Sequence, residues 1–282
     1  MHENQEKAPG RVGLVAGNGM FPVVFSRAAR DRGMAVYAAA HKGEADEDEL
    51  LPLVEKLCPV HVGELGKIIE FFRSHGVNQA VMAGGVTKAK LFSPDYFKPD
   101  ELAVALLERL AHTADDHALR GFASVLEEHG IAVRAPTWLV PELLAPPGVW
   151  TKLPLAEEQR ADAALGFDLA KKIGELDVGQ CLVVAKGTVV AVEAIEGTDA
   201  AIRRAGELGA AGACVVKVKK PIQDERFDLP AVGVQTIRSM MAAGASVLAV
   251  EAGATVVFDK EEMVRLADEA GICIVGLEGA AE

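Results

Sequence analysis

Short apolar runs alternate with helix-like segments through the first half of the chain, and glycines close two of these runs. The runs cover residues 12–16, 35–40 and 79–83, and helical spacing is found at 21–32 and 67–75. Continuous apolar strands joined by helices are typical of a parallel sheet that is covered on both faces. We therefore predict an α/β fold, with a parallel-sheet domain over residues 1–135.

A dense group of prolines interrupts this pattern in the middle of the chain. Five prolines fall between positions 136 and 154, and such density resists both long helices and strand pairing. We place a proline-rich linker at residues 136–156 and a second domain at residues 157–282. Two apolar runs joined by Lys186-Gly187 predict an antiparallel hairpin in this second domain. We therefore expect it to be mixed α/β.

The overall charge argues against one class of function. The net charge is −12, which disfavours non-specific nucleic-acid binding, because such binding needs clustered lysines and arginines. The polar N-terminus has no apolar signal-peptide core, and no run of 18 apolar residues is present. We expect a cytoplasmic protein, with peripheral contact at the inner membrane left open. The four cysteines form no C-x-x-C pair, and Cys181, Cys214 and Cys273, which lie in or beside apolar runs, are expected to be core residues.

Two glycine-rich loops follow predicted strands of the first domain. Gly17-Asn18-Gly19 follows the first strand, and Gly84-Gly85 with Thr87 and Lys88 follows residues 79–83. Open α/β sheets bind ligands at the carboxyl ends of their strands, so these loops predict a nucleotide-binding crevice. Ordinary strand-to-helix turns are the alternative. Pro22 replaces the third glycine of the dinucleotide fingerprint, which disfavours a dehydrogenase.

An acidic loop lies where a strand of the second domain ends and a helix begins. Residues 193–199 contain three glutamates and aspartates besides the helix-capping candidate Thr198. More carboxylates are present than capping requires, with Thr198 or Asp199 expected as the N-cap. Hard oxygen ligands suit Mg²⁺, with Mn²⁺ as a second possibility. A helix cap surrounded by solvated acids is the alternative.

Residues 217–230 alternate bases and acids between prolines. Lys217, Lys220 and Arg226 are suited to neutralising a pyrophosphate, and Asp228 is suited to holding a metal or orienting water. A charged surface loop held by mutual salt bridges is the alternative.

The combined motifs resemble the LpxI family of UDP-2,3-diacylglucosamine pyrophosphatases. The resemblance runs in order from about Arg11 to Gly276, and its most specific parts are E-G-T-D at 196–199 and K-P-I-Q-D-E-R-F-D-L-P at 220–230. It implies an N-terminal Rossmann-like domain, a C-terminal domain and Mg²⁺. It also implies hydrolysis of a lipid-linked nucleotide-sugar, UDP-2,3-diacylglucosamine, to UMP and 2,3-diacylglucosamine 1-phosphate in lipid A synthesis.

We assign candidate roles on this basis. Asp228, Arg226 and Lys217 are the catalytic candidates, and Asp228, Asp199 and Glu196 are the metal-ligand candidates. The substrate-binding candidates are Gly17, Asn18, Gly19, Gly84, Gly85, Thr87, Lys88, Thr198, Lys220 and Gln223. We expect a homodimer. A non-catalytic, nucleotide-binding regulatory module remains the alternative function.

Overall fold

The computed structural model describes residues 10–87, 90, 93, 95–109, 115–227 and 229–279. The chain forms two compact units, which are described separately below. Unit 1 contains Met1–Pro141 and, in addition, the short segment Asp224–Phe227. Unit 2 contains Glu142–Gln223 and Asp228–Glu282. The first change of unit therefore lies inside the proline-rich segment, and the segment that returns to unit 1 was not expected from the sequence.

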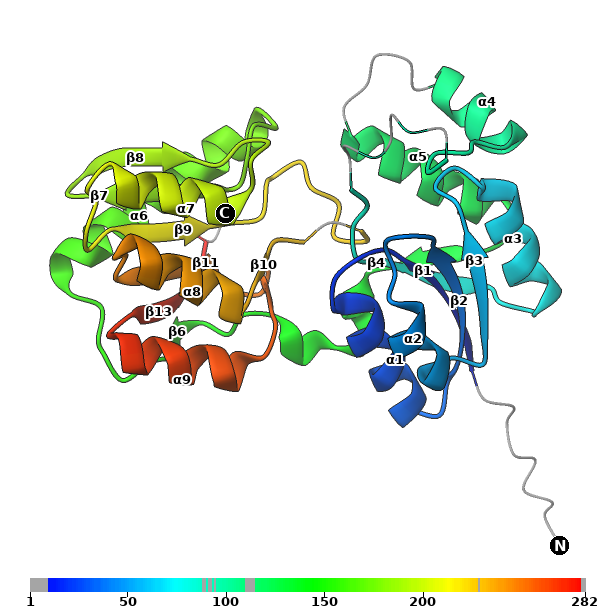
Figure 1. The fold of residues 1–282 in the computed structure, drawn as a ribbon, viewed down its shortest axis with the longest axis horizontal. Coiled ribbons are helices and arrows are strands. Elements are labelled where there is room, and N and C mark those ends of the chain that lie inside the picture. Colours follow the sequence, from blue (N-terminus) through cyan, green and yellow to red (C-terminus); the bar gives the residue numbers. More distant parts are fainter. Residues whose placement is uncertain are drawn as a thin grey trace, which may run out of the picture. The chain divides into compact units, whose positions relative to one another are not determined.

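Unit 1 is built on a five-stranded sheet in which every neighbouring pair is parallel (Figure 1). Its strands are β1 (Arg11–Ala16), β2 (Ala35–His41), β3 (Lys56–Val60), β4 (Gln79–Ala83) and β5 (Ala132–Arg134). Its α-helices are α1 (Phe21–Asp31), α2 (Glu47–Leu50), α3 (Leu65–Ser74), α4 (Glu101–Arg109) and α5 (Asp115–Glu128). The order β3-β2-β1-β4-β5 is that of Rossmann-type sheets. The predicted parallel sheet is thus confirmed.

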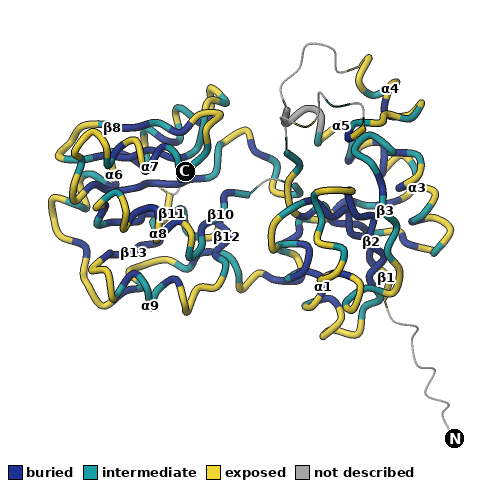
Figure 2. Tube along the Cα trace, viewed as in Figure 1, coloured by how far each residue is buried: buried dark blue, intermediate teal, exposed yellow. Residues whose placement is uncertain are grey.

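Strand β1 shows why the sheet of unit 1 is covered on both faces. Leu14 packs in one apolar cluster with Phe25 of α1, whereas its neighbour Val15 packs in another with Phe72 of α3 and Leu126 of α5. Successive side chains of a strand point to opposite faces, so a continuous apolar run requires helices on both. Figure 2 shows the central strands as buried and the outer helix faces as exposed.

One strand of unit 1 was missed from the sequence. β3 contains Lys56 and Pro59, and within the described part of the chain it pairs with β2 alone, at the edge of the sheet. Proline lacks an N–H donor, so it is tolerated in an edge strand, where one side of the backbone has no strand partner. The same residues obscure the strand pattern in the sequence.

Unit 2 is built on a six-stranded mixed sheet in the order β6-β13-β11-β9-β7-β8 (Figure 1). Its strands are β6 (Gly148–Val149), β7 (Cys181–Ala185), β8 (Thr188–Val192), β9 (Cys214–Lys217), β11 (Val247–Glu251) and β13 (Cys273–Leu277). β10 (Ala231–Val232) and β12 (Val256–Val257) form a separate parallel pair. The helices are α6 (Glu157–Glu175), α7 (Thr198–Glu207), α8 (Val234–Ala243) and α9 (Lys260–Ala270). The predicted mixed α/β domain is confirmed.

The predicted hairpin of unit 2 is also confirmed. β7 and β8 are antiparallel, and Lys186 and Gly187 between them both have positive φ, at 49° and 72°. Two positive φ values give the turn the twist that a tight hairpin needs. The predicted N-cap of the next helix was wrong, because Gly197 occupies the cap and Thr198 is the first helical residue. The Thr198 hydroxyl is engaged elsewhere, as described below.

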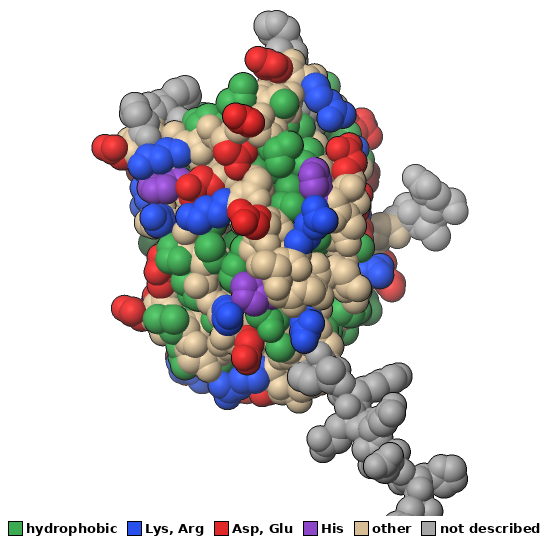
Figure 3. All heavy atoms as spheres, turned by 90° about the vertical axis from the view of Figure 1, so that its right-hand side faces the viewer, with side chains coloured by type: hydrophobic (Ala, Val, Ile, Leu, Met, Phe, Trp, Pro, Cys, Tyr) green, Lys and Arg blue, Asp and Glu red, His purple; other side chains and the backbone are tan. Residues whose placement is uncertain are grey.

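Two expectations about the whole chain concern its cysteines and its helices. Cys181, Cys214 and Cys273 are buried free thiols, and Cys58 is a half-buried one. No helix among the described residues has the length and apolarity to cross a membrane. On the face shown in Figure 3, acidic and basic side chains are interspersed with apolar ones, as on an ordinary solvated surface.

Candidate functional site

The described candidate residues fall into three groups. One group surrounds the carboxyl ends of β1, β2 and β4 in unit 1. The second lies at the carboxyl ends of β8 and β9 in unit 2, which run in the same direction because both are antiparallel to β7. The third is the Asp224–Phe227 segment that returns to unit 1. Lys88 and Asp228, both predicted site residues, lie outside the described residues.

The two glycine loops of unit 1 contact each other directly. The N–H of Asn18 donates to the carbonyl of Gly85 at 2.8 Å, and the N–H of Gly17 donates to Ala83 at 2.9 Å. A Cβ atom at Gly17 would collide with the Gly85 carbonyl oxygen, and one at Gly84 would collide with the Asn18 carbonyl oxygen. These two glycines therefore permit close approach of the loops to each other. Gly19, with φ of 83° and open space around it, is not constrained in this way.

Asn18 is held by polar contacts on both sides of its amide group. Its Oδ1 accepts the N–H of Gly85 at 3.2 Å, and its Nδ2 donates to Glu44 Oε2 at 2.6 Å. Thr87, another predicted substrate-binding residue, donates its hydroxyl to the same Glu44 oxygen at 3.0 Å. Lys90 and Tyr96 contact the other oxygen of Glu44. The loops after β1, β2 and β4 thus meet at one carboxylate.

Glu44 keeps its charge at this position. Burial raises its pKa, but the hydrogen bonds from Lys90, Asn18, Thr87 and Tyr96 outweigh burial and lower the pKa to about 2. Each of these bonds stabilises the ionised carboxylate. Burial and the bond to Glu44 raise the pKa of Tyr96 to about 12, so Tyr96 remains a hydrogen-bond donor.

A buried chain of hydrogen bonds links Lys217, Thr198 and Glu193 in unit 2. Lys217 Nζ donates to the Thr198 hydroxyl at 2.9 Å and to the Ala231 carbonyl at 2.8 Å. Because an ammonium only donates, the Thr198 hydroxyl must direct its proton elsewhere, and it donates to Glu193 Oε1 at 2.8 Å. Lys217 and Glu193 are each 8% exposed. In this series of hydrogen bonds, Lys217 is therefore the donor to Thr198, and Thr198 is the donor to Glu193.

Several polar atoms of unit 2 are buried without a hydrogen-bond partner in the described structure, and two of them belong to the two charged loops predicted as site segments. These two are Oε2 of Glu193, an acceptor, and Nε2 of Gln223, a donor. Buried polar atoms are nearly always hydrogen-bonded, and exceptions commonly mark sites that a ligand or water completes. Gln223 is held in place by the N–H of Lys220, which donates to its Oε1 at 3.1 Å. Lys220 itself forms an ion pair with Asp177 at 2.7 Å.

The acidic loop does not form a ligand cluster from its described residues. Glu196 is ion-paired with Arg204 at 2.7 Å and accepts the N–H of Ala194 at 3.1 Å. Asp199 lies in the first turn of α7, next to Thr198. Among the described residues, which exclude Asp228, no three His, Cys, Asp or Glu side chains are grouped as metal ligands. The described carboxylates alone therefore do not make a metal site.

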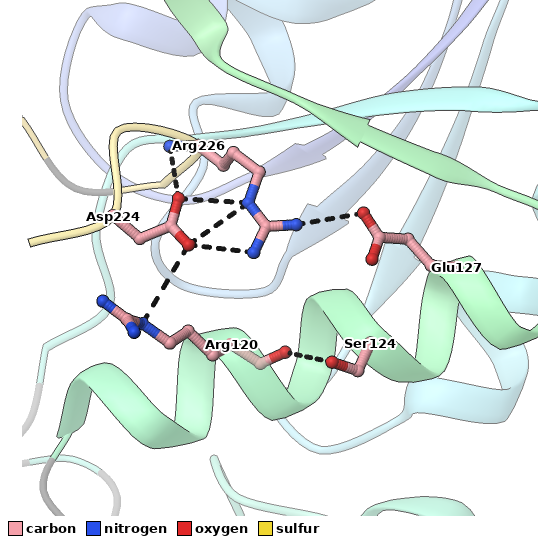
Figure 4. A network of polar contacts seen from close by, with 5 residues as sticks. All are labelled: Arg120, Ser124, Glu127, Asp224 and Arg226. Atoms are coloured by element: carbon pink, nitrogen blue, oxygen red, sulfur yellow. Dashed lines mark hydrogen bonds and ion pairs between the residues drawn. The ribbon is translucent and has the colours of Figure 1, made fainter.

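Arg226 takes part in an ion-pair network inside unit 1 (Figure 4). Its Nε and Nη2 bind Asp224, with the Nη2 contact at 2.8 Å, and its Nη1 lies 3.0 Å from Oε1 of Glu127 on α5. Arg120, which precedes Glu127 on the same helix, approaches Asp224 to 4.0 Å. The hydrogen bonds and charge of Arg226 lower the pKa of Asp224. Arg226 was predicted to neutralise phosphate, and the structure shows it occupied by two carboxylates.

Sequence reasoning missed several residues of these groups. Glu44, Lys90 and Tyr96 lie in a segment without a recognisable motif, and only Glu44's place after a strand end gave a signal. Glu193 was seen as part of the acidic loop but not as the partner of Thr198. Glu127 lies on an ordinary charged helix.

The fold and these polar groups define a two-part α/β protein in which two of the three groups lie at the carboxyl ends of strands. The chain belongs to the LpxI family. Its residues 11–143 match the LpxI N-terminal domain, and its residues 146–275 match the LpxI C-terminal domain. It is 33% identical over 283 aligned positions to the UDP-2,3-diacylglucosamine pyrophosphatase LpxI of Caulobacter vibrioides, covering 95% of this chain and 98% of that protein. The resemblance stated from the motifs is confirmed.

Two solved structures align with this chain at low identity. The biotin carboxylase domain of Hydrogenobacter thermophilus 2-oxoglutarate carboxylase aligns with a TM-score of 0.26 and 14% identity, covering 65% of this chain and 36% of that chain. An N5-carboxyaminoimidazole ribonucleotide synthetase aligns with a TM-score of 0.28 and 11% identity, covering 74% and 47%. Similarity at this level supports no inference about function.

Proposed function

We propose that this protein hydrolyses the pyrophosphate of UDP-2,3-diacylglucosamine to UMP and 2,3-diacylglucosamine 1-phosphate, a step of lipid A synthesis. The observation that carries the proposal is the full-length similarity to the Caulobacter vibrioides enzyme, which extends through both family domains. The chain spans nearly the whole length of that relative.

The hydrogen-bonded residues Lys217, Thr198 and Glu193 of unit 2 support a role in phosphate chemistry. Hydrolysis joins a water oxygen to phosphorus and breaks the bridging P–O bond, so negative charge increases on the leaving phosphate while the water loses a proton. Lys217 places a cation at the first turn of α7, beside Thr198, where helix N–H groups also favour anions. We propose that Lys217, Thr198 and Gln223 contact the phosphates. Lys220 would add charge near them.

The loops of unit 1 would bind rather than react. Gly17, Gly19, Gly84 and Gly85 supply backbone at the carboxyl edge of a parallel sheet, the usual ligand edge of such folds. We assign these loops, with Thr87, to the nucleotide-sugar portion of the substrate.

We further propose that the reaction requires Mg²⁺, with Asp228 as a ligand and Asp199 and Glu196 as candidate co-ligands. The described carboxylates form no three-ligand group, and Glu196 would have to leave Arg204 to take part. When bound, Mg²⁺ would neutralise phosphate charge and lower the pKa of a bound water. Manganese is the expected substitute.

We place the protein in the cytoplasm, with peripheral contact at the inner membrane, and we expect a homodimer. The substrate's two acyl chains support the membrane contact, since such a lipid resides in a bilayer. Sedimentation with vesicles and light scattering would test these two expectations separately.

The function is tested by incubating the protein with UDP-2,3-diacylglucosamine in mixed micelles and following UMP by mass spectrometry. We expect UMP release that stops with chelator and returns with Mg²⁺. Asp228→Asn should lower kcat at least ~100-fold without changing the melting temperature. Asp168→Asn, an exposed aspartate on α6, is the matched control and should keep full activity. Tight binding without UMP release would instead identify a non-catalytic nucleotide-binding module.

A further inference from the structure

Glu44 is an almost completely enclosed carboxylate at the ligand edge of unit 1. It follows the last residue of β2, His41, by three positions, and its side chain is only 2% exposed. A buried charge is costly unless it is paired and hydrogen-bonded. The contacts of Glu44 therefore have to account for its presence there.

Each oxygen of Glu44 accepts two hydrogen bonds, and three of the four donors come from the segment between β4 and α4. Oε1 accepts from Lys90 Nζ at 3.0 Å and from Tyr96 Oη at 2.9 Å. Oε2 accepts from Asn18 Nδ2 at 2.6 Å and from Thr87 Oγ1 at 3.0 Å. An ionised carboxylate has about four acceptor positions, so the described residues saturate it.

The Oε2 contacts fix two groups that the sequence assigned to substrate binding. With Nδ2 on Glu44, the Asn18 side chain must direct Oδ1 towards the N–H of Gly85, which it accepts at 3.2 Å. This sets the amide orientation of Asn18 and ties the β1 loop to the β4 loop. Thr87 is fixed by the same oxygen. Asn18 thus acts between the loops, and its amide is already committed before any ligand arrives.

We propose that Glu44 is a positioning residue for the reaction, holding the loops after β1 and β4 in the geometry that receives the nucleotide-sugar. Glu44 has no free acceptor of its own, so it acts through Asn18 and Thr87. The inference rests on the proposed function. Loops held in a binding-competent arrangement lose less freedom on binding. Since the reacting phosphates are assigned to unit 2, disturbing Glu44 raises KM and leaves kcat nearly unchanged.

An exchange of two isosteric side chains tests the inference. Glu44→Gln sets an NH2 group against the NH2 group of Asn18, and Asn18→Asp sets a second carboxylate against Glu44. Each single variant should raise KM about 10-fold or more, the expected effect of leaving a buried polar pair mismatched. The double variant Asn18→Asp/Glu44→Gln restores the bond with its direction reversed. In it, the carboxylate introduced at position 18 would still accept from Gly85, and the amide oxygen introduced at position 44 would still accept from Lys90 and Tyr96.

We expect KM of the double variant to return to within about threefold of wild type, with kcat similar in all folded variants. Glu64→Gln is the matched control, because Glu64 is also a hydrogen-bonded glutamate of unit 1 but contacts His61 and Lys67 instead of the glycine loops. Its KM should not change. Thr87→Val, which removes one donor and keeps the charge, should raise KM less than Glu44→Gln does.

The outcomes separate the inference from the function on which it rests. If wild type releases no UMP, the proposed function and the inference both fail. If wild type is active and the single variants keep its KM, the inference alone fails. It also fails if the folded double variant shows no recovery of KM. If a single variant does not fold, the comparison of the double variant and Thr87→Val with wild type decides the matter.

Discussion

Arg226 Nη1 lies 3.0 Å from Oε1 of Glu127, although 99 positions separate the two residues. With Asp224, they fasten a short segment of the second half of the sequence to helix α5 of unit 1. Phe227 adds an apolar contact, because it packs against the core cluster of this unit. In the sequence, this anchored segment directly precedes residue 228, the proposed catalytic aspartate.

Breaking this anchor should loosen the segment before it affects the rest of unit 1. Asp224→Asn weakens the paired contact with Arg226 and should destabilise the segment by about 1 kcal/mol, while Glu127→Gln, at a more exposed pair, should cost about 0.5 kcal/mol. Hydrogen exchange of the amides of residues 224–227 measures both. Glu128→Gln, at the exposed neighbour of Glu127, should leave the exchange unchanged. Equal exchange in all four proteins would contradict an anchoring role.

The hydroxyl group of Thr198 should contribute more to kcat/KM than the shape of its side chain does. Thr198→Val keeps the shape but leaves Lys217 and Glu193 each with one partner fewer, and we expect kcat/KM to fall about 10-fold or more. Thr198→Ser keeps the hydroxyl and should stay close to wild type. Steady-state kinetics provide the measurement, with Thr188→Val at an exposed position of β8 as control. Wild-type kinetics in Thr198→Val would show that the chain of hydrogen bonds is not used.

The two glycines flanking Asn18 should respond differently to alanine. Gly17→Ala brings a Cβ against the backbone of Gly85, which cannot yield easily, so we expect a loss of about 3 kcal/mol in the free energy of unfolding. Gly19→Ala meets no neighbour but must adopt a φ near 83°, which costs about 1 kcal/mol. Urea denaturation compares the two. A larger loss at Gly19 would mean that the loops do not touch as described.

Unit 1 should lose stability in acid through two groups. Burial lowers the pKa of His41 to about 4, although Glu44 and Glu64 act to raise it. The unfolded chain therefore binds a proton at His41 that the folded chain does not, and stability falls as the pH drops from about 6.5 to 4. Glu44, with a lowered pKa of about 2, contributes stability that is present above about pH 4.5 and is lost between 4.5 and 2.

Urea unfolding at a series of pH values measures this dependence. His41→Phe should flatten the curve between about pH 6.5 and 4, because it removes the group that charges on unfolding. Glu44→Gln should flatten it below about pH 4.5. Each group contributes on the order of 3 kcal/mol when its full shift is counted. An unchanged curve in both variants would contradict these assignments.

The sequence predicted most elements because local pattern and tertiary position agree in them. The apolar run of β1 is buried on both faces, and Lys186-Gly187 suits a tight hairpin wherever it occurs. Strand β3 escaped detection because its position at the sheet edge tolerates Lys56 and Pro59. A prediction from hydrophobic periodicity does not find β3, because the sequence Lys-Leu-Cys-Pro-Val is neither a continuous apolar run nor a regular alternation.

The sequence revealed the parts of the candidate site that belong to local motifs. It did not reveal the contacts between residues that lie far apart in the chain. The glycine loops follow β1 and β4 as the sequence predicts, but their contact with each other joins positions 18 and 85, which no local motif reveals. Glu44 meets Asn18 and Thr87 across 26 and 43 positions. Arg226 looked like a phosphate ligand because its partner Glu127 lies on a distant helix. The ion-pair partner of a charged side chain depends on the tertiary structure, so it is not visible in the local sequence.

Because Asp224–Phe227 belongs to unit 1, the two halves of the gene cannot be separated or exchanged freely. The match to the LpxI N-terminal domain ends at residue 143, yet the half-buried Phe227 packs against the core of unit 1. A gene cut at that boundary would encode a first half that lacks the contact with Phe227. The second half would carry residues 224–227 without their partners Glu127 and Arg120 on α5. The two halves of the sequence therefore do not correspond to two independent structural units. Exchange between relatives is expected to preserve function only when the first half and residues 224–227 come from the same parent.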